Sequence, residues 1–136
     1  MAQTAGIING TLIGIYVAGT KVANATSNDL DLSMALRETT NKDTSGYKTS
    51  LGGILSWTCS GEGFFAEDAA YGFDDLFAVW AARTAVTVMI SSQVSGDKKY
   101  TGSALLINLK RTAPLEANTT FTVSFEGTGA LTEATI

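Results

Sequence analysis

Histidine is absent from this chain of 136 residues, and cysteine occurs once, at Cys59. Without histidine, the chain lacks the side chain that most often serves as a general base and as a transition-metal ligand. One cysteine cannot form an internal disulfide, and alone it does not supply the ligands of a structural zinc site. We therefore expect no catalytic, cofactor-binding or metal-binding residues.

Basic residues are also few. The chain has nine Lys and Arg against thirteen Asp and Glu, a formal net charge of −4 and a pI of about 4.6. No basic face for gripping nucleic acid is indicated. Carboxylates are loosely grouped at Glu62, Glu67, Asp68, Asp74 and Asp75. Because nothing in their spacing fixes the separation that a glycosidase pair needs, we expect no enzyme activity.

Long hydrophobic runs are missing as well. Residues 1–17 contain no Lys or Arg, and Asn9, Gly10 and Gly14 interrupt their apolar character. The segment is therefore a poor signal peptide and too short and broken to span a bilayer. We expect a soluble protein of cytoplasmic origin with no membrane partner.

Proline occurs only at Pro114, whereas threonine is abundant. This composition suits long strand ladders, and the length suits one domain with its own core. Period-2 alternation predicts about seven strands, within residues 13–17, 21–26, 29–36, 51–60, 86–90, 100–109 and 119–126. Residues 61–63 and 95–97 are predicted turns.

One segment, residues 73–83, is predicted to be helical. Its large apolar residues recur at the i, i+3, i+4, i+7 spacing of one helix face, and they are Phe73, Leu76, Phe77 and Trp80. If a sheet buries this face fully, Trp80→Ala would cost about 3–5 kcal/mol. The predicted fold is mainly β, an antiparallel β-sandwich or half-open barrel with one packed α-helix.

The strand at residues 29–36 has two different sides. Alternation separates an apolar set from a polar, partly acidic set, namely Leu30, Leu32 and Met34 against Asp29, Asp31 and Ser33. Residues 36–50 then lose all apolar periodicity and form a long polar loop. Long loops inside a compact domain are commonly functional, and a plain surface loop is the alternative.

Several motifs occur in a recognisable order. A hairpin at residues 14–26 precedes a strand motif at 25–33 and a polar loop motif at 40–47. The next strand carries Leu51, Gly53, Ser56, Trp57, Ser60, Glu62 and Gly63. Beyond the helix come small residues at 102–104 and a closing segment with Phe125, Gly127, Gly129 and Leu131. From Gly14 to Leu131 this arrangement resembles the major tail tube proteins of long-tailed bacteriophages.

The resemblance implies a structural subunit of a virion tail, made in the bacterial host cytoplasm. Hexameric rings would stack into a tube that conducts double-stranded DNA, with tape-measure, tail-tip and tail-terminator proteins as partners. The loop at about 36–50 would reach the next ring, with candidate contacts at Thr39, Thr40, Lys42, Asp43, Tyr47 and Lys48. A flexible N-terminal arm (about 1–11) and a short C-terminal tail (about 130–136) would bridge neighbours.

Charge suggests what could line such a tube. DNA carries about one negative charge per 1.7 Å of axis, so a basic channel would hold it, whereas an acidic or neutral channel would let it slide. Asp29, Asp31 and Ser33 are the candidate lining residues. A solvated outer face is the alternative for them.

Two other functions are compatible with a β-sandwich. Inner tubes of contractile injection and type VI secretion machines look similar to the phage proteins. A small carbohydrate-binding module is a different class, and it would need an exposed aromatic platform. The large aromatics fall on predicted core faces instead, at Trp57, Trp80, Phe73, Phe77, Phe121 and Phe125.

Overall fold

The computed structural model describes residues 5–10, 13–22, 25–66 and 72–136. It contains one antiparallel sheet of eight strands and one helix. The elements are β1 (Gly14–Val17), β2 (Thr20–Lys21), β3 (Ala25–Glu38), β4 (Ser50–Phe64), α1 (Phe73–Ala82), β5 (Val86–Ser91), β6 (Lys98–Thr112), β7 (Thr120–Gly127) and β8 (Thr132–Thr135). The predicted mainly-β class with one helix is confirmed.

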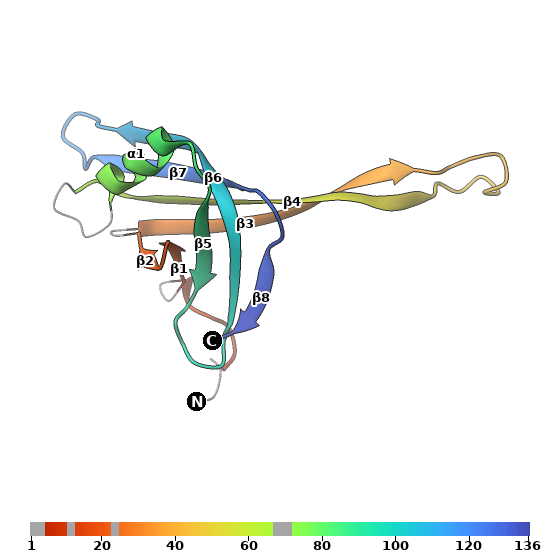
Figure 1. The fold of residues 1–136 in the computed structure, drawn as a ribbon, viewed down its shortest axis with the longest axis horizontal. Coiled ribbons are helices and arrows are strands. Elements are labelled where there is room, and N and C mark those ends of the chain that lie inside the picture. Colours follow the sequence, from red (N-terminus) through yellow and green to blue (C-terminus); the bar gives the residue numbers. More distant parts are fainter. Residues whose placement is uncertain (1–4, 11–12, 23–24, 67–71) are drawn as a thin grey trace.

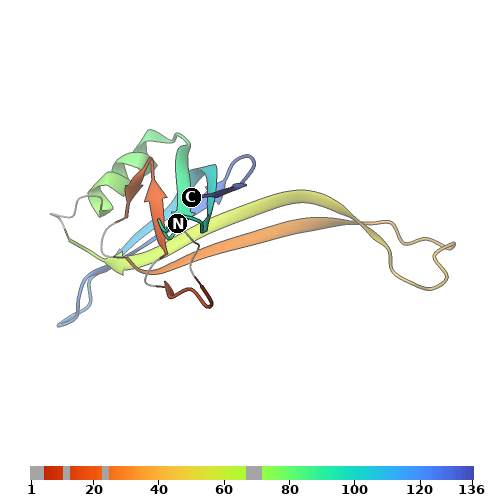
Figure 2. The same cartoon turned by 90° about the horizontal axis from the view of Figure 1, so that it is seen from below.

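The strand order is β2-β1-β5-β6-β7-β4-β3. Strand β6 is long and belongs to two sections of the sheet, one with β2, β1, β5 and β8 and the other with β7, β4 and β3. Its first half pairs with β5 and β8, and its second half pairs with β7. The sheet folds over on itself, so that α1, β1 and β2 lie on one side of the β3–β4 hairpin (Figures 1 and 2). The Asn28 side-chain amide on β3 donates to the carbonyl of Ile13, just before β1, at 3.0 Å. This hydrogen bond links the two sections of the sheet.

The core fills the space inside this fold. On β7, Phe121, Val123 and Phe125 are each no more than 2% exposed, which confirms the alternation predicted for that strand. They pack with apolar residues from the other half of the sheet and the helix, among them Ile15, Val17, Val88 and Leu76. Burial of these side chains is the main source of the fold's stability.

Cys59 lies in the core with no exposed surface, as predicted. Burial, with a smaller contribution from the Asp29 carboxylate, raises the pKa of its thiol to about 12. The thiolate is the reactive form, so Cys59 should resist a thiol reagent at pH 8 in the native protein and react after unfolding in guanidinium. Rapid stoichiometric labelling of the native protein would contradict this assignment.

The same pKa has a consequence for stability. An unfolded thiol ionises near pH 9, whereas the folded thiol keeps its proton up to about pH 12. Above pH 9 the unfolded state therefore binds fewer protons than the folded state, and the free energy of unfolding falls as pH rises. Denaturant midpoints measured between pH 8 and 11 should show this decline, and a Cys59→Ser variant should lose that part of it.

One prediction about the strands was wrong. Residues 61–63 do not turn the chain, because β4 continues through them, with Gly61 opposite Val123 and Gly63 opposite Phe121. On β6, the alternating apolar residues Leu105 and Ile107 are 40% and 53% exposed. A register shift between residues 106 and 108 changes the side of the sheet to which the strand points its apolar residues.

The predicted helix is present, but its aromatic face is only partly covered. Leu76 is fully buried, whereas Phe77 is 54% and Trp80 is 51% exposed. The helix contacts the sheet mainly through β6, near the edge of the sheet, so part of its apolar face extends beyond the sheet. The large cost expected for Trp80→Ala does not apply to the isolated chain, because that expectation assumed full burial.

The predicted arms at the two ends of the chain differ in the structure. Residues 1–4 and 11 of the predicted N-terminal arm lie outside the described residues, and residues 5–10 are exposed. The C-terminal tail contains β8, which pairs with the first half of β6. Its last residue also exchanges backbone hydrogen bonds with the 96–97 turn, at 2.9 and 3.1 Å. Bridging of neighbours by either end stays a prediction.

Candidate assembly surfaces

The β3–β4 hairpin extends well beyond the rest of the sheet (Figure 1). Strand β3 pairs with β4 as far as Glu38 opposite Ser50, but β4 pairs with β7 only from Thr58 onward. Among the described residues, the outer part of the hairpin therefore has no third strand beside it. A two-stranded ribbon is marginally stable in water by itself, so contacts with another surface would stabilise this part.

One side of the projecting hairpin is apolar and exposed. Leu32 lies opposite the buried Trp57, and Met34 lies opposite Leu55, so all four point to the same side of the sheet. Leu32, Met34, Leu36 and Leu55 are 51–75% exposed. The sequence predicted a half-buried apolar side for this strand, but Leu32 and Met34 are exposed in the isolated chain. An exposed apolar row of this kind marks an interaction surface.

The polar loop at the tip of the hairpin is shorter than predicted. It spans residues 39–49, since Leu36, Arg37 and Glu38 pair with β4. The Thr39 and Thr49 hydroxyls lie 2.8 Å apart, and the Thr44 hydroxyl donates to the Asn41 carbonyl at 2.7 Å. Of the six candidate contact residues, Thr39 is half-buried, and Thr40, Lys42, Asp43, Tyr47 and Lys48 are exposed.

The opposite side of the sheet is polar across β3, β4, β7 and β6. Asp29 lies opposite Ser60, Ser60 lies opposite Ser124, and Asp31 lies opposite Thr58. Where the four strands lie side by side, this face carries the apolar Leu105 and Phe64 and otherwise mainly polar side chains, among them Asp29, Asp31, Thr58, Ser60, Glu62, Thr122, Ser124, Glu126, Asn108 and Lys110. Carboxylates outnumber the one basic group among them. Ser33 continues the face onto the hairpin, opposite Ser56.

These four strands end in two open edges. Strand β3 is the last strand of the sheet. At the other edge, β5 pairs with β6 only as far as Ala104. Within the described residues, the second half of β6 therefore has a strand partner on its β7 side alone. Open edges offer backbone hydrogen-bonding groups to another chain.

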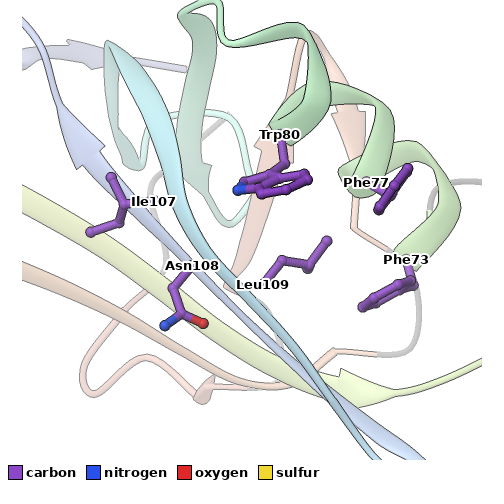
Figure 3. A pocket seen from close by; sticks show the side chains of 6 residues that line it. All are labelled: Phe73, Phe77, Trp80, Ile107, Asn108 and Leu109. Atoms are coloured by element: carbon purple, nitrogen blue, oxygen red, sulfur yellow. The ribbon is translucent and has the colours of Figure 1, made fainter.

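A shallow groove runs between α1 and this open half of β6 (Figure 3). Its volume is about 420 Å³, and it is lined by five apolar residues and one amide, namely Phe73, Phe77, Trp80, Ile107, Leu109 and Asn108. At the start of α1, the Arg111 guanidinium stacks over Phe65 and Phe73, with 5.2 and 5.6 Å to the ring centroids. These contacts hold the helix against β6 and leave Phe77 and Trp80 projecting above the groove.

The groove and the apolar hairpin row were not identified from the sequence. Periodicity showed that these residues share apolar faces, but it carried no signal for which faces the subunit itself covers. In the part of the chain that the structure describes, no group of three His, Cys, Asp or Glu side chains is placed to hold a metal ion. Nor does that part contain a helix long and apolar enough to cross a bilayer.

Solved structures with the same fold come from tail and injection-machine tubes. The tail of an empty gene transfer agent particle, with C6 symmetry, aligns with a TM-score of 0.78 at 18% identity over 93% of this chain and 98% of that chain. The SPP1 tail tube gives 0.77 at 10% identity over 96% and 80%. The sheath–tube complex of an extracellular contractile injection system gives 0.65 at 13% identity over 91% and 88%.

Comparison of the sequence identifies one family. A search of curated proteins finds no match. The family model described as phage tail tube protein matches residues 15–133, a range that runs from β1 into β8. The chain therefore belongs to the phage tail tube protein family, whose members are structural proteins of the virion tail.

Proposed function

We propose that six copies of this chain join edge to edge into a ring, and that the rings stack into a tube that conducts double-stranded DNA. The observation that carries the proposal is the four-stranded section β6-β7-β4-β3, which has open edges on both sides and one continuous polar face. The C6 symmetry of the gene transfer agent tail supports the number six. The ring has no catalytic task in this proposal.

Strand directions make such a ring possible. Neighbouring strands in the section are antiparallel, so β6 and β3 run in opposite directions. Rotation about a ring axis parallel to the strands would bring β3 of one copy beside β6 of the next as an antiparallel pair. The contact is heterologous and repeats at every junction, and a rotation that closes gives a ring.

The polar face supports the assignment of the lumen. With all polar faces turned inward, Asp29 and Asp31 would line the channel together with hydroxyl groups of β4 and β7. Lys110 is the one basic residue among the side chains named for this face, against the carboxylates of Asp29, Asp31, Glu62 and Glu126. Phosphates would meet few cations there, so DNA would pass without being held. Ser33 would continue the lining along the hairpin.

The projecting hairpin supports stacking. Its open apolar row and its polar tip need a partner surface, and the ring above or below can supply one. The tip loop would then contact the next ring through Thr39, Thr40, Lys42, Asp43, Tyr47 and Lys48. Tape-measure, tail-tip and tail-terminator proteins are the further partners expected at the two ends of the tube.

A second candidate is the inner tube of a contractile injection machine, which the similarity to a sheath–tube complex favours. The two functions differ in whether a sheath surrounds the tube. A carbohydrate-binding role has less support. Phe77 and Trp80 are exposed, as a sugar-binding platform would require, but they line a groove at an open strand edge.

Negative-stain electron microscopy of the purified protein over a range of concentrations tests the ring. Hollow rings or tubes are expected, with or without a tail-tip initiator. Small monomeric particles under every condition, initiator included, would contradict the proposal.

Deletion of residues 39–47 tests stacking separately. These residues form hydrogen bonds only within the loop and with its ends, so the domain should keep its melting temperature. We expect rings or monomers from this variant and no tubes under conditions in which the wild type gives tubes. Tubes of wild-type length would refute the stacking role of the loop.

A further inference from the structure

We propose that the groove between α1 and β6 holds the apolar side of β3 from the neighbouring copy in the same ring. Helix α1 would close over the junction between two subunits from the side that faces away from the lumen. This inference rests on the edge-to-edge ring proposed above, and it identifies the surfaces that make the ring contact selective.

The position of the groove is the first support. It opens at the second half of β6, next to the edge that has no strand partner within the described residues. Phe77 and Trp80 stand over this edge, and their ring centroids lie 5.8 Å apart. A strand added to β6 would therefore run directly beneath two exposed aromatic side chains.

The chemistry of β3 is the second support. Its apolar residues lie on the same side of the sheet as α1, because Leu30 and Leu32 pair with the core residues Cys59 and Trp57. Leu30 lies level with Leu106 across the sheet, and closure of a barrel staggers neighbouring strands along their length. If sheet sides are preserved across the junction, this stagger brings Leu32, Met34 or Leu36 of one copy to the groove of the next. Aromatic and aliphatic surfaces would then cover one another and be removed from contact with water.

Charges on the other side of the sheet support the same arrangement. The open half of β6 carries Lys110, whereas the polar side of β3 carries Asp29 and Asp31. Joining these two edges places the basic edge of one copy beside the acidic edge of the next. Joining two β3 edges would bring carboxylates together, which is unfavourable. The charges thus favour the unlike-edge contact that a ring needs.

The occupant must come from a second copy. Strand β3 and the open half of β6 lie at opposite edges of the four-stranded section. Figure 1 shows the free end of the hairpin pointing away from α1. The apolar row of a chain therefore cannot reach its own groove while the sheet stays intact.

Cysteine cross-linking provides the test. Phe77→Cys would be combined in turn with Leu32→Cys, Met34→Cys and Leu36→Cys, and assembled rings would be oxidised. The native Cys59 is buried, so it should not interfere. At least one pair should give a ladder of covalent oligomers that ends at the ring size, because a disulfide forms only when the two Cα atoms lie within about 7 Å.

Mixing the single variants supplies the control. Phe77→Cys mixed with the partner cysteine variant should give cross-linked dimers, and each single variant alone should give none. If microscopy shows rings but none of the three pairs cross-links, the groove assignment is wrong and the ring proposal stands. If the wild type gives no rings with an initiator present, the ring proposal itself fails.

Polar substitution supplies a second readout. Phe77→Gln with Trp80→Gln should raise the concentration needed for half-maximal ring assembly by about tenfold or more, as expected for interface anchors. Phe77→Leu with Trp80→Phe keeps the apolar surface and should assemble much more readily. Unchanged assembly of the Gln variant, with an unchanged melting temperature, would overturn the inference.

Trp80 also reports on the contact directly. The chain has two tryptophans, and Trp57 is 5% exposed while Trp80 is 51% exposed. Quenching of fluorescence by acrylamide should therefore arise mainly from Trp80 in the monomer and fall when rings form. Rings in which Trp80 is quenched as strongly as in the monomer would place the groove on an outer surface and refute the inference.

Discussion

Replacement of Trp57 by alanine is expected to destabilise the subunit by about 3–5 kcal/mol, the cost of removing a large buried aromatic side chain. Trp57 is 5% exposed, and its indole N–H donates to the Gly129 carbonyl at 3.1 Å. A side chain at either Gly102 or Gly127 would collide with the indole ring. The loss would leave a cavity that the two strands cannot fill, since neither position carries a side chain.

Urea unfolding followed by circular dichroism measures this effect. Trp57→Phe is the matched control, because it keeps an aromatic ring and removes the N–H donor. It should lose the hydrogen bond, which contributes about 1 kcal/mol, and a small part of the buried volume. A midpoint for Trp57→Ala close to that of the wild type would show that the indole is not a core element. Gly127→Ala should also destabilise, because its methyl group would enter the space that the indole occupies.

Trp57 also connects the core to the assembly surfaces. It is the last buried residue of β4 before the exposed part of the hairpin, and its hydrogen bond reaches the segment between β7 and β8. The indole thus fixes the base of the hairpin to two other strands. A variant without the indole should assemble poorly even below its melting temperature, because the hairpin would no longer be held in one orientation relative to the rest of the sheet.

The strands whose partners lie within the subunit were predictable from the sequence. Strand β7 alternates between core and polar face along its whole length, so its period of 2 indicates both the element and its buried side. The limits of β4 were harder to predict. Glycines at 61 and 63 usually signal a turn, but here Gly61 lies close to the Ile15 side chain, where little room is left for a Cβ.

Apolar periodicity could not show which faces stay open. Leu32 and Phe77 have the spacing of core residues, yet both are more than half exposed in the subunit. Their partners, on our proposal, are residues of another copy, and a single sequence contains the same apolar pattern whether the covering surface is internal or external. On β6, a register shift between residues 106 and 108 changes which alternate residues are buried, and the period of 2 in the sequence does not reveal such a shift.

The candidate lumen residues provide the sharpest test of function. Asp29→Lys with Asp31→Lys turns two carboxylates of the polar face into cations in every subunit. Both side chains are exposed, so the fold should tolerate the change. Assembled tails of this variant should release DNA at least about tenfold more slowly, because cations along the channel bind phosphates.

Release of DNA from purified particles, measured at several salt concentrations, checks this prediction. Salt should restore part of the rate in the Lys variant, since it weakens phosphate contacts. Asp74→Lys with Glu116→Lys makes the same change in charge on exposed residues away from the polar face, and it should leave release unaltered. Asp29→Asn with Asp31→Asn removes charge without adding cations and should have a small effect. Normal release through assembled Lys-variant tails would mean that Asp29 and Asp31 do not face the DNA, and the polar face would then lie elsewhere in the tube.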